Sequence, residues 1–134
     1  MTLIGLTPTT QRTEGYPFGE CVRAAYAAIL DLPIEAVPRF DPAVRRPGED
    51  LRTCECRWLA SIGLRLLEIA TSPEKELPQA VLDCVPPVEH LISGVSPRGF
   101  GHRCVGWGGR VLWDPHPSRA GLRTVYSLGF LVPR

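Results

Sequence analysis

The chain has 134 residues, of which 44% are hydrophobic and 22% charged, and its 15 basic and 14 acidic side chains give a formal net charge of +1. This length and balance predict one globular domain over residues 1–134 and exclude a disordered chain. Near-neutrality removes the electrostatic basis for a nucleic-acid partner or for attachment to a membrane surface.

The first helix is predicted to begin at Cys21, after a polar segment rich in turn formers over residues 1–20. Apolar side chains then recur at helical spacing and form one stripe along the helix. Pro33 ends this helix, and residues 33–37 add a short helical turn. The members of the stripe are Val22, Ala25, Tyr26, Ile29 and Leu30.

A second helix is predicted from about residue 49 to 62, after a surface loop over residues 38–48 in which proline and aspartate recur. Gly63 is the expected end of this helix. Its apolar face carries Leu51, Cys54, Trp58, Leu59 and Ile62.

Short strands are predicted after Gly63. Residues 64–70 are apolar enough to form a buried strand. Further strands are expected over residues 88–93, 103–107, 110–114 and 124–131, and together they form an antiparallel sheet. Helices followed by strands indicate an α+β domain.

The five cysteines form no paired framework, and the N-terminus shows no secretory signal. No apolar run approaches the roughly 20 residues that a helix needs to span a bilayer. We therefore expect a reduced, cytoplasmic protein without a membrane partner.

Cys21 is the first candidate functional residue because it opens a predicted helix. A thiol reacts as the thiolate, and its free pKa is about 8.5. The positive end of a helix and its unpaired N–H groups stabilise that thiolate. A free cysteine is more commonly a small buried residue packed under a helix, so the interpretation depends on partners.

His102 and Asp114 are the candidate partners. His102 follows the glycine-containing segment 97–101 and opens an apolar strand, and Asp114 ends the next strand. The imidazole could take the thiol proton, and the carboxylate could orient the imidazole. The alternative interpretations are a surface histidine at a hairpin end and a turn-forming aspartate.

The register of the hairpin decides whether this pair can meet. A two-residue turn at residues 108–109 would pair His102 with Pro115 and turn Asp114 to the opposite face. A three-residue loop at residues 107–109 would place His102 opposite Asp114. The pair therefore requires the longer loop, a β-bulge, or an Asp114 that has already left the strand.

Gln11, ten residues before Cys21, is a candidate oxyanion donor. Its side-chain amide and the backbone N–H of Cys21 could stabilise the negative oxygen that forms when a thiolate attacks a carbonyl. The alternative is an ordinary solvated loop glutamine.

The four residues resemble, in their order, the catalytic residues of the papain-like cysteine peptidase superfamily. The chain looks most similar to small bacterial and phage-type members akin to bacteriocin-processing peptidases, including over segments 93–99 and 114–118. The resemblance implies a papain-like α+β fold, with a nucleophile helix and a second helix packed on an antiparallel sheet. It implies that Cys21 is the nucleophile and that Gln11 is the oxyanion donor. It also implies that His102 is the general base that later acts as acid, and that Asp114 orients this histidine.

This pattern predicts a cysteine hydrolase or acyltransferase that cleaves an amide, isopeptide or thioester bond in a protein, a peptide or a small molecule, without a cofactor. Arg98, His116 and Trp113 are candidate substrate contacts, and His116 is also an alternative to His102. The second hypothesis is a non-catalytic binding module of papain-like fold, encoded by a phage and acting on a host factor.

A structural zinc site at Cys54-Glu55-Cys56, with Cys84 or His90, is not expected. Residues two apart on a helix point in different directions, and no second CxxC pair completes a tetrahedral ligand set. Cys54 is predicted to lie in the core and Cys56 to point to the side of the helix. His90 is predicted to be a half-buried strand residue.

Overall fold

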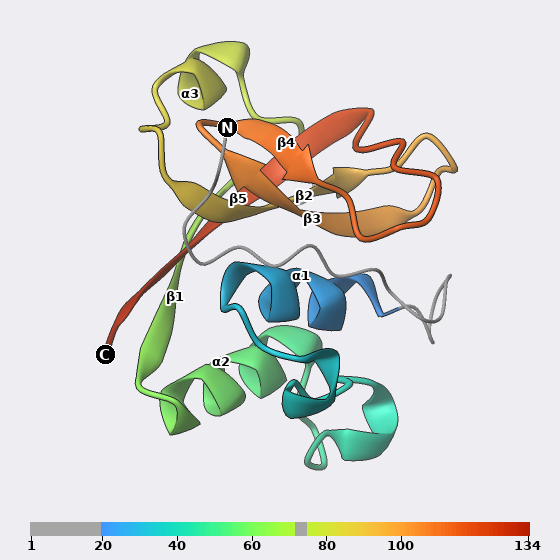
Figure 1. The fold of residues 1–134 in the computed structure, drawn as a ribbon, viewed down its shortest axis with the longest axis vertical. Coiled ribbons are helices and arrows are strands. Elements are labelled where there is room, and N and C mark those ends of the chain that lie inside the picture. Colours follow the sequence, from blue (N-terminus) through green and yellow to red (C-terminus); the bar gives the residue numbers. More distant parts are fainter. Residues whose placement is uncertain (1–19, 72–74) are drawn as a thin grey trace.

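The computed structural model describes residues 20–71 and 75–134, which form an α+β domain with an open antiparallel sheet (Figure 1). The strand order is β1-β5-β2-β3-β4. The predicted α+β class and the antiparallel sheet are confirmed. In chain order the elements are α1 (Cys21–Ile29), the 3-10 helices η1 (Ile34–Ala36) and η2 (Pro42–Val44), α2 (Leu51–Ser61), β1 (Leu64–Ala70), α3 (Gln79–Asp83), β2 (Glu89–Val95), β3 (Gly101–Trp107), β4 (Arg110–Trp113) and β5 (Thr124–Pro133).

Helix α1 lies between the sheet and α2, so it is covered on two sides (Figure 1). Residues 24–28 are fully buried, and four of these five are alanines. Small side chains let the sheet and α2 approach the helix axis closely, because interaxial distance depends on the side chains at the contact. The predicted stripe does face the core, but α1 buries more of its circumference than that stripe.

The two faces of the sheet support two apolar cores, because side chains alternate along each strand. Leu91 in β2 and Val105 in β3 pack against the helices α1 and α2. The next residue in β2, Ile92, and the preceding residue in β3, Cys104, join the second core with Leu77 and Leu128.

Strand β1 corrects the prediction that residues 64–70 are buried. It stands at an edge of the sheet and pairs only with β5 among the described strands. Leu67 and Ile69 are 58% and 42% exposed. Apolar composition predicts a strand, but the position of that strand in a sheet depends on crossovers that local sequence does not reveal.

Two further residues depart from the predictions. Ile62, assigned to the buried face of the second helix, is exposed just beyond the end of α2. Phe40, in the loop predicted to lie at the surface, is buried and packs its ring 5.7 Å from Tyr26 and 5.6 Å from Trp58. An aromatic ring contributes a large buried area, which explains why this loop folds back onto the core.

The β3–β4 hairpin has a two-residue turn at residues 108–109, not the three-residue loop. The pairing then slips by one residue, because Leu112 forms a β-bulge in β4. The paired residues are Trp107 with Arg110, Gly106 with Val111, and Val105 with Trp113.

This bulge determines the face on which Asp114 lies. Continued without a bulge, the two-residue turn would align Asp114 with Arg103. With the bulge, Asp114 aligns with Cys104, which shares a face of β3 with His102. Asp114 has also left β4, which ends at Trp113. Two of the three conditions that allow the pair to meet are therefore satisfied.

Candidate active site

Cys21 is the first residue of α1, as the sequence predicted. The first N–H groups of a helix have no acceptor within it, and they give this end a partial positive charge. The residue as a whole is neither fully buried nor fully exposed.

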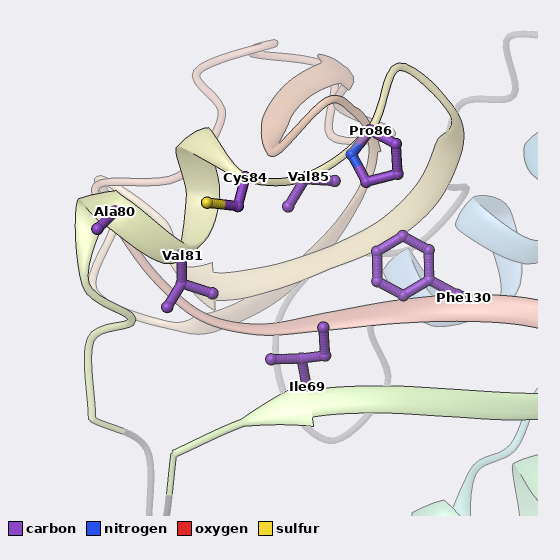
Figure 2. A pocket seen from close by; sticks show the side chains of 7 residues that line it. All are labelled: Ile69, Ala80, Val81, Cys84, Val85, Pro86 and Phe130. Atoms are coloured by element: carbon purple, nitrogen blue, oxygen red, sulfur yellow. The ribbon is translucent and has the colours of Figure 1, made fainter.

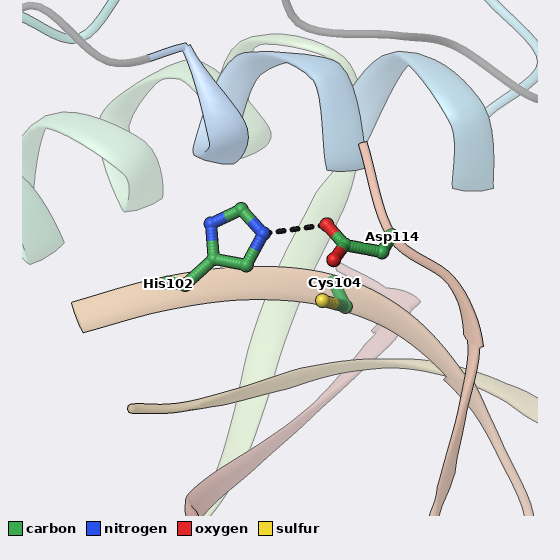
Figure 3. A group of neighbouring side chains, drawn as sticks. All are labelled: His102, Cys104 and Asp114. Atoms are coloured by element: carbon green, nitrogen blue, oxygen red, sulfur yellow. Dashed lines mark hydrogen bonds and ion pairs between the residues drawn. The ribbon is translucent and has the colours of Figure 1, made fainter. Parts of the chain in front are cut away.

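His102 and Asp114 form a short hydrogen bond of 2.6 Å between Nε2 and Oδ1, and both side chains are buried (Figure 3). The carboxylate of Asp114 also accepts hydrogen bonds from the backbone N–H groups of His116, at 2.8 Å, and Gly121, at 2.7 Å. Burial alone would raise the pKa of Asp114, but these hydrogen bonds lower it to about 2. Asp114 is therefore a carboxylate that holds one ring nitrogen of His102.

Cys21 and His102 stabilise each other in their charged forms. Burial alone would raise the pKa of Cys21, but the hydrogen bond and charge of His102, followed by the backbone N–H and charge of Arg103, lower it below its ordinary value. Burial alone would lower the pKa of His102, but Asp114 and the neighbouring thiols raise it. Because Nε2 is held by Asp114, Nδ1 is the ring nitrogen left to exchange a proton with a thiol.

A second thiol, Cys104, also contacts the imidazole of His102. It is fully buried, and burial raises its pKa. The two thiols therefore differ in chemistry: Cys21 favours the thiolate at the start of a helix, and Cys104 favours the neutral thiol within the core.

The side chains of His102, Cys104 and Asp114 bring a nitrogen, a sulfur and an oxygen ligand atom within 4.8 Å of one another. This donor set suits zinc. However, the Nε2–Oδ1 distance is 2.6 Å, whereas two ligands at about 2.0–2.1 Å from a tetrahedral zinc ion lie about 3.3 Å apart. The arrangement is therefore that of a hydrogen-bonded pair, and a metal ion would have to separate it.

The candidate substrate contacts lie in the two loops beside the pair. Arg98, in the β2–β3 loop, donates from Nη1 to Oγ of Ser118 at 3.0 Å. The Nδ1 atom of His116 accepts a 3.0 Å hydrogen bond from the N–H of Ser118. Ser118 therefore joins the β2–β3 loop to the β4–β5 loop, close to the candidate catalytic pair.

His116 does not take the place of His102. Its ring stands edge-on to the ring of His102 at a centroid distance of 6.1 Å, and it is the backbone of His116 that contacts Asp114. Trp113 is half-buried against the first core, and the guanidinium of Arg119 lies 4.1 Å from its ring centroid. Trp113 therefore supports the β4–β5 loop through a cation–π contact.

Gln11, the predicted oxyanion donor, lies outside the described residues. The backbone N–H of Cys21, its predicted companion, is at the start of α1 as expected.

His90 is fully buried, which is more than the half-burial predicted; its ring lies 5.3 Å from that of Phe130, and both ring nitrogens bond to the backbone. Its Nε2 accepts from the N–H of Gly109 at 3.0 Å, so Nδ1 must carry the proton and donate to the carbonyl of Leu91 at 2.9 Å. Gly106 leaves room for the ring, since a Cβ there would lie 2.3 Å from its Cε1. Burial lowers the pKa of His90, which makes it a neutral structural residue.

Cys54 is buried, as predicted, and Cys56, predicted to face the side of the helix, is exposed. Three residues near the site were not predicted from the sequence: Cys104, Arg103 and Glu55. Signals for two of them, Cys104 and Glu55, are present in the sequence. Cys104 is two residues from His102 and so shares its face of a strand, and Glu55 falls at the i+4 position of the apolar stripe that begins at Leu51.

An apolar cavity of about 340 Å³ lies apart from these residues, between β1, α3 and β5 (Figure 2). Its lining contains none of the candidate site residues and consists of Ile69, Ala80, Val81, Cys84, Val85, Pro86 and Phe130.

No helix in the described part of the chain combines the length and apolarity needed to cross a membrane. Comparison of the chain with models of known protein families, with curated proteins and with solved structures finds no match.

Proposed function

We propose that the chain is a cysteine hydrolase or acyltransferase of papain-like fold, in which Cys21, His102 and Asp114 act as a catalytic triad on an amide, isopeptide or thioester bond. One observation carries the proposal: a single buried imidazole is held by a carboxylate at 2.6 Å and is close enough to a thiol at the start of a helix to lower its pKa. Nucleophile, base and orienting acid, each in contact with the next, are what nucleophilic catalysis requires.

The proposed reaction begins with attack of the Cys21 thiolate on the carbonyl carbon of the substrate. The backbone N–H of Cys21 is free of an intrahelical acceptor and stabilises the resulting oxyanion. Protonated His102 then gives its proton to the leaving amine or thiol, and the C–N or C–S bond breaks. His102 next takes a proton from water or from an acceptor amine, which attacks the thioester and releases Cys21.

The substrate is proposed to be a protein or peptide, or a small amide or thioester. His116 lies beside the imidazole of His102 and is joined through Ser118 to Arg98 by hydrogen bonds. A phage-encoded enzyme that modifies a host protein fits this proposal, on the resemblance described above.

The first experiment measures the pH dependence of alkylation of each cysteine by iodoacetamide, resolved by mass spectrometry. Cys56 is exposed and serves as a control thiol within the same molecule. We expect Cys21 to label with an apparent pKa well below 8.5, and His102→Ala to raise that value while the labelling of Cys56 stays unchanged. Labelling of Cys21 that is no faster than that of Cys56 and indifferent to His102 would reject the triad.

Turnover is tested with panels of fluorogenic peptide amides, isopeptide-linked peptides and thioesters. Wild type is compared with Cys21→Ala, and Cys104→Ala is the matched control because it removes the other thiol that contacts His102. We expect the first variant to abolish turnover and the second to retain it. An activated Cys21 with no turnover and no acyl-enzyme by mass spectrometry would favour the binding module.

A further inference from the structure

A buried cluster of charged and polar groups links the helix that carries Cys21 to the strand that carries His102. The carboxylate of Glu55, in α2, accepts a 2.6 Å hydrogen bond from the hydroxyl of Tyr26, in α1. The same carboxylate forms an ion pair with the guanidinium of Arg103, in β3. Arg103 also donates from Nε to Oγ of Ser93, in β2, at 3.2 Å.

This ion pair is taken out of water. Glu55 is fully buried, and Arg103 is 7% exposed. Desolvation of two charges offsets much of their attraction, so a buried ion pair is weak evidence of a contribution to stability. Its retention inside the core between α1, α2 and the sheet calls for another role.

The cluster reaches the candidate nucleophile by two routes. Arg103 follows His102 in β3, and both its backbone N–H and its positive charge lower the pKa of Cys21. Tyr26 lies on α1, five residues after Cys21, and its ring is 5.7 Å from the guanidinium carbon of Arg103.

We propose that Glu55 and Arg103 are positioning residues for the Cys21–His102 pair: their ion pair, together with the Tyr26 hydrogen bond to Glu55, holds α1 and α2 against β3, and the Glu55 carboxylate sets how much of the positive charge of Arg103 acts on the thiolate. This inference rests on the proposed function, because it assigns a regulator to the same nucleophile. It predicts the direction in which the apparent pKa of Cys21 changes in each variant, whereas a role in packing alone predicts no such direction.

The test compares Glu55→Gln with Arg103→Gln through the apparent pKa of Cys21 in the alkylation assay. Glu55→Gln keeps an acceptor for Tyr26 and Arg103 but leaves the guanidinium uncompensated, so the apparent pKa of Cys21 falls. Arg103→Gln removes the positive charge, so the apparent pKa rises. A change of one pKa unit alters the thiolate fraction about tenfold at pH values below the pKa. The apparent pKa is compared, not the rate, because the reactivity of a thiolate declines with its pKa.

Three variants serve as controls. Glu68→Gln breaks the partly exposed Arg52–Glu68 ion pair between α2 and β1, and it should leave the apparent pKa of Cys21 unchanged. Arg103→Lys keeps the charge and should restore most of the wild-type value. If Arg103→Gln fails to fold, the double variant Glu55→Gln/Arg103→Gln, whose buried charges are both removed, should show a higher apparent pKa than Glu55→Gln alone.

Opposite shifts in the two single variants support the proposal. Shifts in the same direction would show that the cluster acts only by packing and would overturn it, as would the absence of any shift. Failure of the proposed function is a separate result, because it is measured in wild type and His102→Ala without either substitution.

Discussion

Replacing Asp114 by asparagine tests the acid of the candidate triad through protein stability, without knowledge of a substrate. The carboxylate accepts hydrogen bonds from His102, from the N–H of His116 and from the N–H of Gly121. Together they hold its pKa at about 2, compared with an ordinary 3.8. At roughly 1.4 kcal/mol for each pKa unit, this difference corresponds to about 2 kcal/mol of folding free energy.

The sign of the effect follows from the direction of the pKa change. A carboxylate whose pKa is lower in the folded than in the unfolded protein contributes stability at pH values above the unfolded pKa, here about 3.8. The contribution is lost as pH falls through about 2. The advantage of wild type over Asp114→Asn in free energy of unfolding should therefore shrink by about 2 kcal/mol between about pH 5 and about pH 1, a range in which His102 is protonated in both the folded and the unfolded protein.

The assay is urea unfolding followed by tryptophan fluorescence, at a series of pH values from neutral to acid. His102→Ala provides the matched background, because it removes one of the three donors to the carboxylate. In that background the acid-dependent effect of Asp114→Asn should be smaller but not absent. If wild type and Asp114→Asn lose stability in parallel throughout the acid range, Asp114 has an ordinary pKa and the inferred pairing with His102 is wrong.

The remaining predictions concern the scaffold around the site. Gly94→Ala should destabilise the protein by about 3 kcal/mol or more in thermal or urea unfolding, because its Cβ would lie 1.7 Å from the carbonyl oxygen of Thr124; a loss below about 1 kcal/mol would contradict this packing. Tyr26→Phe should cost about 1.5–3 kcal/mol in urea unfolding, since it removes a hydrogen bond to a buried carboxylate, and an unchanged midpoint would contradict that bond. Deletion of Leu112 should remove the β-bulge and turn the carboxylate of Asp114 to the opposite face of the sheet, which should raise the apparent pKa of Cys21 in the alkylation assay. An apparent pKa identical to that of wild type would show that the bulge is dispensable.

Most of the elements could be predicted from the sequence because their signals are local. Helical spacing after Cys21 and the glycine at position 63 predicted α1 and the end of α2, and Gly63 indeed has a φ of +81°. Proline and glycine separated the strands of the sheet correctly. The short helix α3 was missed, because five residues carry too little periodicity to distinguish them from a loop.

The parts that could not be predicted depend on relations between elements. The hydrogen bond between His102 and Asp114 depends on one extra residue in β4, and a strand pattern does not show whether a bulge is present. Glu55 was read as one member of a Cys-Glu-Cys motif, whereas its burial is explained by Arg103, 48 residues later in the chain. A charged residue on an apolar stripe thus signals a buried partner, but sequence alone does not identify that partner.

The site can assemble because β4 is short. It pairs only with the last three residues of β3, so the first four, Gly101 to Cys104, have β2 as their only neighbouring strand in the described sheet. The backbone N–H of Arg103, which lowers the pKa of Cys21, therefore lies in a stretch without a β4 partner, and so does His102. Exposed strand edges are normally blunted or covered because they invite pairing with other chains. Here Cys21, at the start of α1, lies near His102 and Arg103 in that uncovered stretch, so the early end of β4 leaves room for the candidate nucleophile beside its base.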